Sequence, residues 1–225
     1  MFDPRNLETV MNMCRVELTG VSDALLKATM FEVMDEFFRD TNSWREEIVF
    51  NVAPPATAPA TPQQFQAATA YPITPSEGQI IRLDGVINGN RSQVAALMPE
   101  VGVIHLTHVP NFAQQYTAFV TKNVSLPLTK DDYPIGPDWL LQKWHLAIKH
   151  GMIGYCMNQK NKSYSDIKGA LYNLQKFRQF VANVRSAVLR ANTIGAAAWR
   201  FPQQFRSISQ KGGVPVYATG NDWSG

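Results

Sequence analysis

Basic side chains recur between residues 166 and 198 at a spacing that would let a helix present them to an anionic partner. They are Lys168, Lys176, Arg178, Arg185 and Arg190, and Asp166 is the nearby acid. At roughly 100° per residue in a helix, Lys168, Lys176 and Arg190 lie on the side away from the apolar residues, whereas Arg178 and Arg185 lie along the edge. Such cations suit phosphate contacts or salt links to acidic helices of a neighbouring molecule. A solvated helix face is the third interpretation.

Patterns that mark catalytic or metal sites are absent from the sequence. The four histidines do not combine with cysteines or carboxylates at the spacing of a metal-binding loop: His105, His108, His145 and His150. No phosphate-binding loop or nucleophile elbow occurs, nor any pattern of a base-reading domain. Acidic side chains that are typical of solvated faces are Asp35, Glu36, Glu46, Glu47, Asp131 and Asp132. We expect a non-catalytic protein without metal or cofactor, and any contact with nucleic acid should be non-specific and directed at the backbone.

Charge is distributed unevenly along the chain, although the formal net charge is only +3. Residues 1–60 hold five basic and ten acidic side chains, and residues 61–159 hold six of each. Residues 160–225 hold ten basic and two acidic side chains. This asymmetry favours contact of the basic end with a polyanion, or packing of an acidic face on a neighbour's basic face.

The compartment is predicted from the cysteines and the apolar segments. Cys14 and Cys156 lie among apolar neighbours and are predicted to be reduced core thiols. No stretch approaches the roughly 18 to 20 apolar residues of a membrane span, and the first residues lack a signal-peptide pattern. We therefore expect a protein made in the cytoplasm of the producing cell, without a membrane partner.

The first third of the chain predicts two helices and a strand. Apolar residues three and four apart predict a helix over residues 6–18. Ser22 and Asp23 provide capping chemistry for a second helix that runs to about Asp40. Its predicted buried stripe is Leu25, Leu26, Thr29, Met30, Val33, Met34, Phe37 and Phe38. A short strand is expected over residues 47–52, followed by a proline-rich loop over residues 53–62.

Short β-type runs and then two more helices are predicted after that loop. The runs cover residues 79–87, 101–109, 116–121 and 124–128, with turns or bulges at Gly85 and Asn88-Gly89-Asn90. A helix should begin near Asp138 and continue to about residue 159, where Gly151 and Gly154 either allow a close backbone approach or break the helix. Ser165 and Asp166 should cap the longest helix, which extends to residue 194 or 198. Its expected apolar side is Leu171, Leu174, Phe177, Val181, Val184 and Val188.

These elements predict an α+β fold that is mainly a helical bundle with an inserted small antiparallel β module. The helical body is assigned to residues 1–52 and 136–198, with two helices at each end. Residues 53–135 form the proline-rich loop and the β-rich insert. Residues 199–225 form an extended C-terminal tail, because the helical pattern is lost from Trp199 onward.

The sequence resembles the head-to-tail adaptor, or connector, proteins of tailed bacteriophages. At the N-terminal end, the resemblance covers residues 11–22, the helix of residues 24–41 and Ser43-Trp44-Arg45. At the other end, it covers Pro137-Asp138-Trp139-Leu140, the run of residues 151–157 and the long helix of residues 172–190. The closing stretch of residues 199–205 is also similar. The resemblance spans roughly residues 5–52 and 136–206, and the β-rich insert departs from the compact helical plan of the family.

What this resemblance implies is a virion protein of the neck, between head and tail. Such a subunit forms a ring, commonly of twelve copies, which binds below the portal protein, extends the DNA channel and meets a tail or nozzle protein. If the long helix lines the channel, either Arg178 and Arg185 or else Lys168, Lys176 and Arg190 would lie nearest the genomic DNA. The C-terminal tail would dock on the portal through Trp199, Arg200, Phe201, Phe205, Tyr217 and Trp223. The alternatives are a non-specific DNA-binding or packaging accessory protein and an unrecognised hydrolase.

Overall fold

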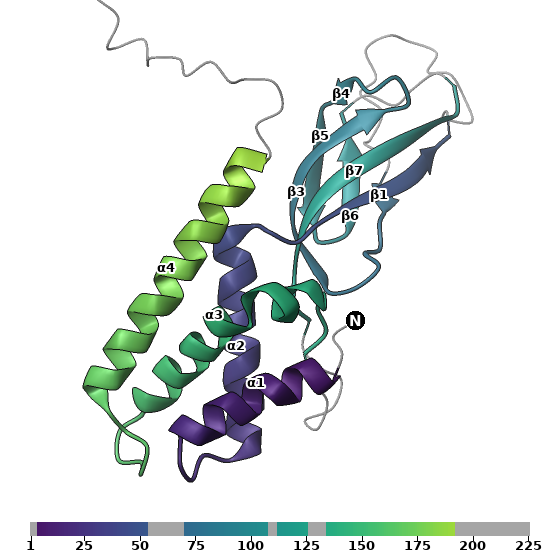
Figure 1. Cartoon of the computed structure of the whole chain (residues 1–225). Helices are drawn as coiled ribbons and strands as arrows, with labels where there is room; N and C mark the ends of the chain where they lie inside the picture. The colour runs from purple at the N-terminus through teal and green to yellow at the C-terminus, as the bar shows by residue number, and fades with distance from the viewer. Residues whose placement is uncertain (1–3, 54–69, 108–111, 126–133, 192–225) are drawn as a thin grey trace, which may run out of the picture. The chain divides into compact units, whose positions relative to one another are not determined.

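The computed structural model describes residues 4–53, 70–107, 112–125 and 134–191. The chain divides into two compact units, residues 1–188 and 189–225, and the packing described below is that of the first unit. The described ranges hold four helices and seven strands, with two helices before the strands and two after them (Figure 1). The strands therefore lie between the two pairs of helices in sequence.

The two N-terminal helices form around the apolar residues predicted for them. α1 spans Pro4–Glu17 and α2 spans Asp23–Thr41. Ser22 caps α2, because its side chain accepts a hydrogen bond from the backbone N–H of Leu25. The helix ends where Asn42 adopts a left-handed conformation with φ of 50°. The predicted stripe of α2 is buried, except that Leu25 is only partly buried.

The third helix, α3 (Trp139–Met157), contacts each of the other three. A Cβ atom added to Gly151 would lie 2.5 Å from Val33 of α2, and one added to Gly154 would lie 2.8 Å from Leu174 of α4, which spans Ile167–Ala191. Both glycines therefore permit close approach, one of the two roles predicted for them. The break in α3 falls instead at Trp144, whose φ of −125° and ψ of 20° are not helical.

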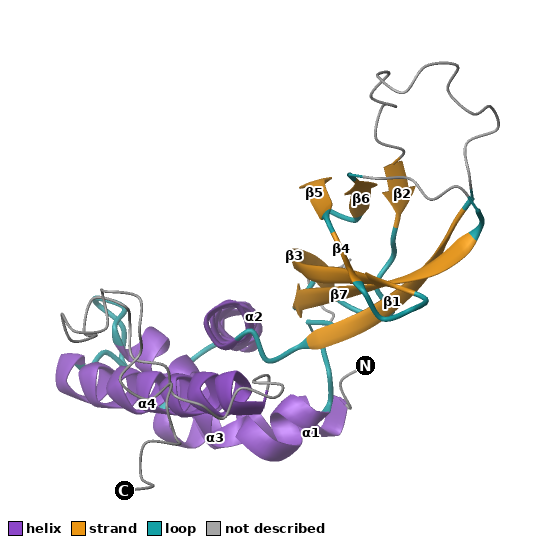
Figure 2. Cartoon of the chain, turned by 90° about the horizontal axis from the view of Figure 1, so that it is seen from above, coloured by secondary structure: helices purple, strands orange, loops and turns teal. Residues whose placement is uncertain are grey.

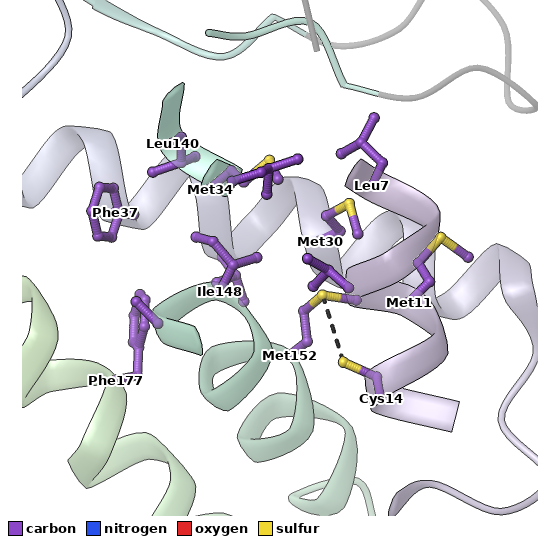
Figure 3. Close-up of a cluster of buried hydrophobic side chains, with 14 of the residues drawn as sticks. Leu7, Met11, Cys14, Met30, Met34, Phe37, Leu140, Ile148, Met152 and Phe177 are labelled. Atoms are coloured by element: carbon purple, nitrogen blue, oxygen red, sulfur yellow. Dashed lines mark hydrogen bonds between the residues drawn. The ribbon is translucent and has the colours of Figure 1, made fainter. Parts of the chain in front are cut away.

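All four helices contribute to one hydrophobic core. Figure 3 shows sulfur-containing and aromatic side chains from four helices gathered around Ile148 and Met152 of α3. The thiol of Cys14 on α1 lies 4.0 Å from the sulfur of Met152. Both cysteines are free and buried, as predicted for core thiols. Burial raises the pKa of Cys14 to about 12 and also raises the pKa of Cys156.

The strands form two antiparallel sheets (Figure 2). The two sheets share a second hydrophobic core. The four-stranded sheet has the order β1-β7-β3-β4 and contains β1 (Arg45–Val52), β7 (Gln114–Asn123), β3 (Gln79–Asn88) and β4 (Gln93–Val94). The three-stranded sheet has the order β2-β6-β5 and contains β2 (Ala70–Pro72), β6 (Val103–Leu106) and β5 (Ala96–Glu100). Side chains such as Phe50, Ile104 and Val120 fill the space between them.

The prediction of a mainly helical bundle is wrong, because seven strands in two sheets make this a mixed α+β fold. Three strands were not predicted at all, and each is short: β2, β4 and β5. β2 and β5 also contain Pro72 and Pro99, and proline is confined to edge positions in sheets because it cannot donate a backbone hydrogen bond. β1 pairs along its whole length with β7 and so belongs to the sheet.

The other β predictions have mixed outcomes. The runs at residues 79–87 and 116–121 are confirmed as parts of β3 and β7. Within the run at residues 101–109, the strand is β6, which spans Val103–Leu106. β7 ends at Asn123, so residues 124 and 125 are not a strand, and residues 126–128 lie outside the described ranges. A bulge between Leu83 and Gly85 and a turn that begins at Asn88 confirm both predicted irregularities.

A buried lysine joins the four-stranded sheet to the helices. Lys122 near the end of β7 is 2% exposed, and its Nζ lies 2.7 Å from Glu46 and 4.4 Å from the centre of the Trp44 ring. The backbone N–H of Lys122 donates to the carbonyl of Trp44. The Trp44 ring packs in turn on Phe38 of α2, with 5.2 Å between ring centres. A lysine ammonium group that is this deeply buried is stable only because it contacts both a carboxylate and the face of an aromatic ring.

Two further contacts complete this junction. Asn123 donates from its side chain to the backbone carbonyl and the carboxylate of Asp35 on α2. Gly78, with φ of 71°, packs so closely that an added Cβ would lie 2.5 Å from the Trp44 ring and from the Asn123 carbonyl. The strand ends are therefore tied to α2 by side chains that satisfy one another.

Replacing Gly151 or Gly154 by alanine should lower the free energy of unfolding. The added methyl group overpacks the contact with α2 or α4, at a cost of about 1–3 kcal/mol. The higher helix propensity of alanine, about 1 kcal/mol, offsets only part of this cost. Urea denaturation measures the change. Gly85→Ala is the control, since no atom lies within 4 Å of its added Cβ. Stability equal to wild type in both helix variants would contradict the close approach.

Acid should weaken the junction through Glu46. Partial burial alone would raise the pKa of Glu46, but hydrogen bonds from Lys122 and Ser76 outweigh burial and lower that pKa below its usual value. A lowered folded-state pKa contributes stability above the unfolded-state pKa of about 4.3, and this contribution is lost as the pH falls through the folded-state pKa. The stability difference between wild type and Glu46→Gln should therefore shrink between pH 7 and pH 3. Glu47→Gln, at an exposed position, should show no such trend, and a constant difference for Glu46→Gln would refute the assignment.

Candidate functional site

The outward side of α4 carries a concentration of positive charge. The helix contains five basic and no acidic residues among its 25. Asp166 caps it as predicted, since its carboxylate accepts the backbone N–H of Lys168 at 3.0 Å. Ser165 is instead part of the preceding turn, where it accepts from the N–H of Lys162 and donates to the carbonyl of Gln159. The helix reaches Ala191, and its predicted extension to residue 194 or 198 lies outside the described ranges.

The five predicted basic residues are found on different parts of this helix surface. Lys168, Arg178, Arg185 and Arg190 are exposed. Lys176 is half-buried, and its Nζ lies 5.6 Å from the ring centre of Tyr172. None of the five forms an ion pair with another residue of the described ranges. Their charges are therefore left for water or for a partner.

The inward side of α4 differs at two positions from the predicted apolar side. Phe177, Val181 and Val184 are buried as predicted, and Leu174 and Val188 are half-buried, but Leu171 is 65% exposed. Asn173 is buried instead, and it donates to the carbonyl of Gly169 while its Oδ1 lies 2.7 Å from Nδ1 of His150. Asn173 lies four residues before Phe177, a helical spacing that indicates burial, but polar side chains are not expected on the apolar side of a helix.

Two sets of exposed side chains can be separated on the outward side. At about 100° per residue, Lys168 lines up with exposed polar residues, which we call the polar row: Lys168, Gln175, Gln179 and Ser186. Arg178 and Arg185 line up with exposed apolar residues, which we call the arginine edge: Ile167, Leu171, Arg178 and Arg185. Ile167 is 68% exposed.

A tyrosine–glutamate hydrogen bond joins α3 to α2. Tyr155 of α3 donates a hydrogen bond to Glu36 of α2. Burial, followed by this hydrogen bond, raises the pKa of Tyr155 to about 12, and the charges of Arg178 and Glu32 also act on it. The charge of Arg178 lowers this pKa, whereas the charges of Glu36 and Glu32 raise it.

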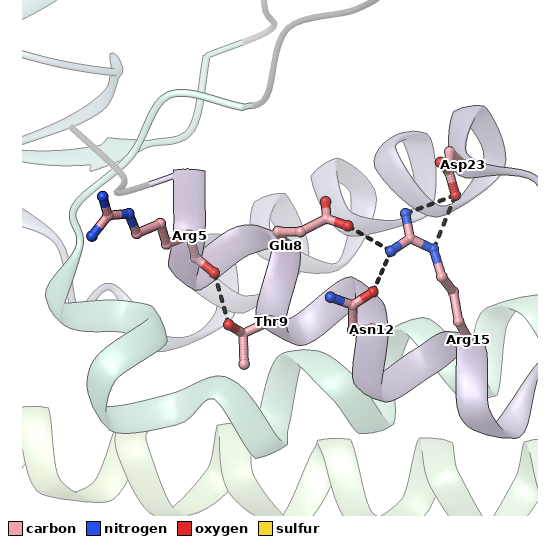
Figure 4. Close-up of polar contacts among 6 residues, drawn as sticks. All are labelled: Arg5, Glu8, Thr9, Asn12, Arg15 and Asp23. Carbon is pink, nitrogen blue, oxygen red and sulfur yellow. Dashed lines mark hydrogen bonds and ion pairs between the residues drawn. The ribbon is translucent and has the colours of Figure 1, made fainter.

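Acidic side chains of the N-terminal helices form ion pairs within the subunit. Arg15 donates hydrogen bonds to Glu8, Asn12 and Asp23, which links α1 to the start of α2 (Figure 4). Glu17 pairs with Lys149 of α3 at 2.7 Å. The acidic excess of the first 60 residues is thus partly neutralised within the subunit, and less of it is left for a neighbour than the sequence alone indicates.

No group of three or more histidine, cysteine, aspartate or glutamate side chains that could hold a metal occurs within the described ranges. His150 stacks on Phe180 with 6.1 Å between ring centres and bonds to Asn173, so its contacts are structural. His108, Asp131 and Asp132 lie outside the described residues, as does the predicted portal-docking tail: Trp199, Arg200, Phe201, Phe205, Tyr217 and Trp223.

Among the helices that the structure describes, none is long and apolar enough to cross a bilayer. Comparison of the sequence with protein families and with curated proteins finds no match.

Removing the Tyr155 hydroxyl should leave Glu36 without its partner. We expect Tyr155→Phe to lower the free energy of unfolding by about 1 kcal/mol at pH 8. Because the folded-state pKa is raised, this contribution is present below the unfolded-state value of about 10 and is lost as the pH rises toward 12. Chemical denaturation at pH 8 and pH 11 tests both points, with Tyr172→Phe at an exposed position as control. A difference that grows with pH would contradict the assignment.

Proposed function

We propose that this chain is a non-catalytic structural subunit of a tailed bacteriophage neck that acts as a head-to-tail adaptor. It forms a ring, with twelve copies as the expected number, below the portal protein and above a tail or nozzle protein. The ring extends the channel through which the genomic DNA passes. The observation that carries the proposal is α4, whose five cations have neither an acidic residue in the helix nor an ion pair with the described residues.

The dimensions and composition of α4 support contact with duplex DNA. At about 1.5 Å per residue its length is about 37 Å, close to one helical turn of B-DNA. Lysine, arginine, glutamine and serine side chains bind phosphate oxygens without reading bases. A channel must let every sequence pass, so contacts of this kind suit its wall.

The division of the first unit into a helical core and a two-sheet core supports a subunit with more than one neighbour. The helical core holds α4 in place from the inside, through Phe177, Val181 and Val184. The sheets provide a separate surface that the DNA-facing helix does not use. In the proposed assembly, the C-terminal residues 199–225 dock on the portal.

Sedimentation velocity of the full chain, with and without the portal protein of the same virus, tests this function. The chain alone should sediment as a monomer or a weakly associated species, and with portal it should co-sediment in a fixed ratio of about one chain per portal subunit. A chain that ignores the portal but binds duplex DNA, with affinity falling steeply as salt rises, would contradict the adaptor and favour a DNA-binding accessory protein.

A further inference from the structure

Apolar side chains occupy the face of the four-stranded sheet that points away from the second sheet. Registers across β1, β7 and β3 place Val49, Thr117 and Ile87 in one row, and Glu47, Phe119 and Gly85 in the next. Val49 is 54% exposed. Neither Phe119 nor Ile87 packs against either hydrophobic core of the described residues. We call these six residues the outer sheet face.

This pattern departs from that of a sheet with one solvated side. Such a sheet alternates apolar residues facing the core with polar residues facing water. Val49, Ile87 and Phe119 break the alternation, because the core positions of the same strands are already filled by residues such as Phe50, Val86 and Val120. An added Cβ at Gly85 would meet no atom of the described residues within 4 Å, so none of them fills this position of the outer sheet face. The outer sheet face therefore has the composition of a surface that a partner covers.

Charge distinguishes the outer sheet face from the arginine edge of α4. Glu47 is exposed, and no ion pair within the described residues involves it. The next row holds Arg45 and Arg82, which share Asp84 at 3.7 and 2.7 Å. The arginine edge combines exposed Ile167 and Leu171 with two arginines, so it can pack on the apolar side chains of the outer sheet face and bring a cation to Glu47.

We propose that the arginine edge of α4 docks on the outer sheet face of a second copy of this chain, which leaves the polar row of α4 for DNA. The inference rests on the proposed function for the DNA contact, and it adds the residues that join neighbouring subunits. Arginine beside apolar side chains is enriched in the cores of protein interfaces, whereas lysine is depleted there.

Because the two docking surfaces are different patches, the contact is heterologous. Each copy uses its helix edge toward one neighbour and its sheet face toward the other. A heterologous contact generates a closed ring when its rotation closes. The same contact would produce the ring of the proposed function without requiring any other surface of the first unit.

A charge exchange tests the pairing on the full chain without portal, by sedimentation equilibrium over a wide concentration range. Arg178→Glu with Arg185→Glu should weaken self-association by at least about 10-fold, and Glu47→Arg should weaken it as well. Combining all three substitutions should restore association to within about 3-fold of wild type. Lys160→Glu with Lys162→Glu changes the net charge equally at exposed positions and should have little effect.

Three results would overturn the inference. They are a wild-type chain that shows no self-association, an arginine-edge variant no weaker than the lysine control, and a triple variant that does not recover. Circular dichroism of each variant establishes that it is folded. The charge-exchange experiment contains no portal, so a failure of portal binding would not change its result. If the pairing of the two surfaces fails instead, co-sedimentation with portal still decides the adaptor function.

Discussion

The arrangement of helices and sheets in the first unit depends on the contacts of the buried Lys122 ammonium group. This group lies over the Trp44 ring and against Glu46, and the same tryptophan packs on Phe38 of α2. Removing either receiving group would leave a charge with little access to water, which is far more costly than losing a surface ion pair. The position of the four-stranded sheet relative to α2 is therefore set by electrostatics as well as by apolar packing.

Within the helical core, close contact at two glycines has a comparable role. Gly151 admits α2 and Gly154 admits α4, so α3 lies in contact with both. Because Phe177, Val181 and Val184 are held inward by this packing, the basic residues of α4 must project outward. Internal packing thus places on a surface positive charge that forms no ion pair within the described residues, and the proposed contacts with DNA and a second subunit follow from that placement.

The sequence predicts the helices well, because burial follows the helical period and Ser22 and Asp166 cap as expected. It predicts the sheets less well: β2 and β5 contain proline and gain their pairing from distant strands rather than from local preference. Burial of Lys122 could not be inferred, since lysine is usually exposed and its partners are a tryptophan and a glutamate that only folding brings together. The outer sheet face depends on register across three strands, which sequence pattern alone does not specify.

In the proposed ring, the polar row of α4 faces the channel. Electron microscopy can locate this row directly. A Lys168→Cys variant can be labelled selectively with a small gold cluster, because the two natural cysteines are buried. Rotationally averaged images of the labelled chain bound to portal should place the gold at the inner rim of a ring coaxial with the portal. Gold at the outer rim, or no ring on the portal, would contradict the claim.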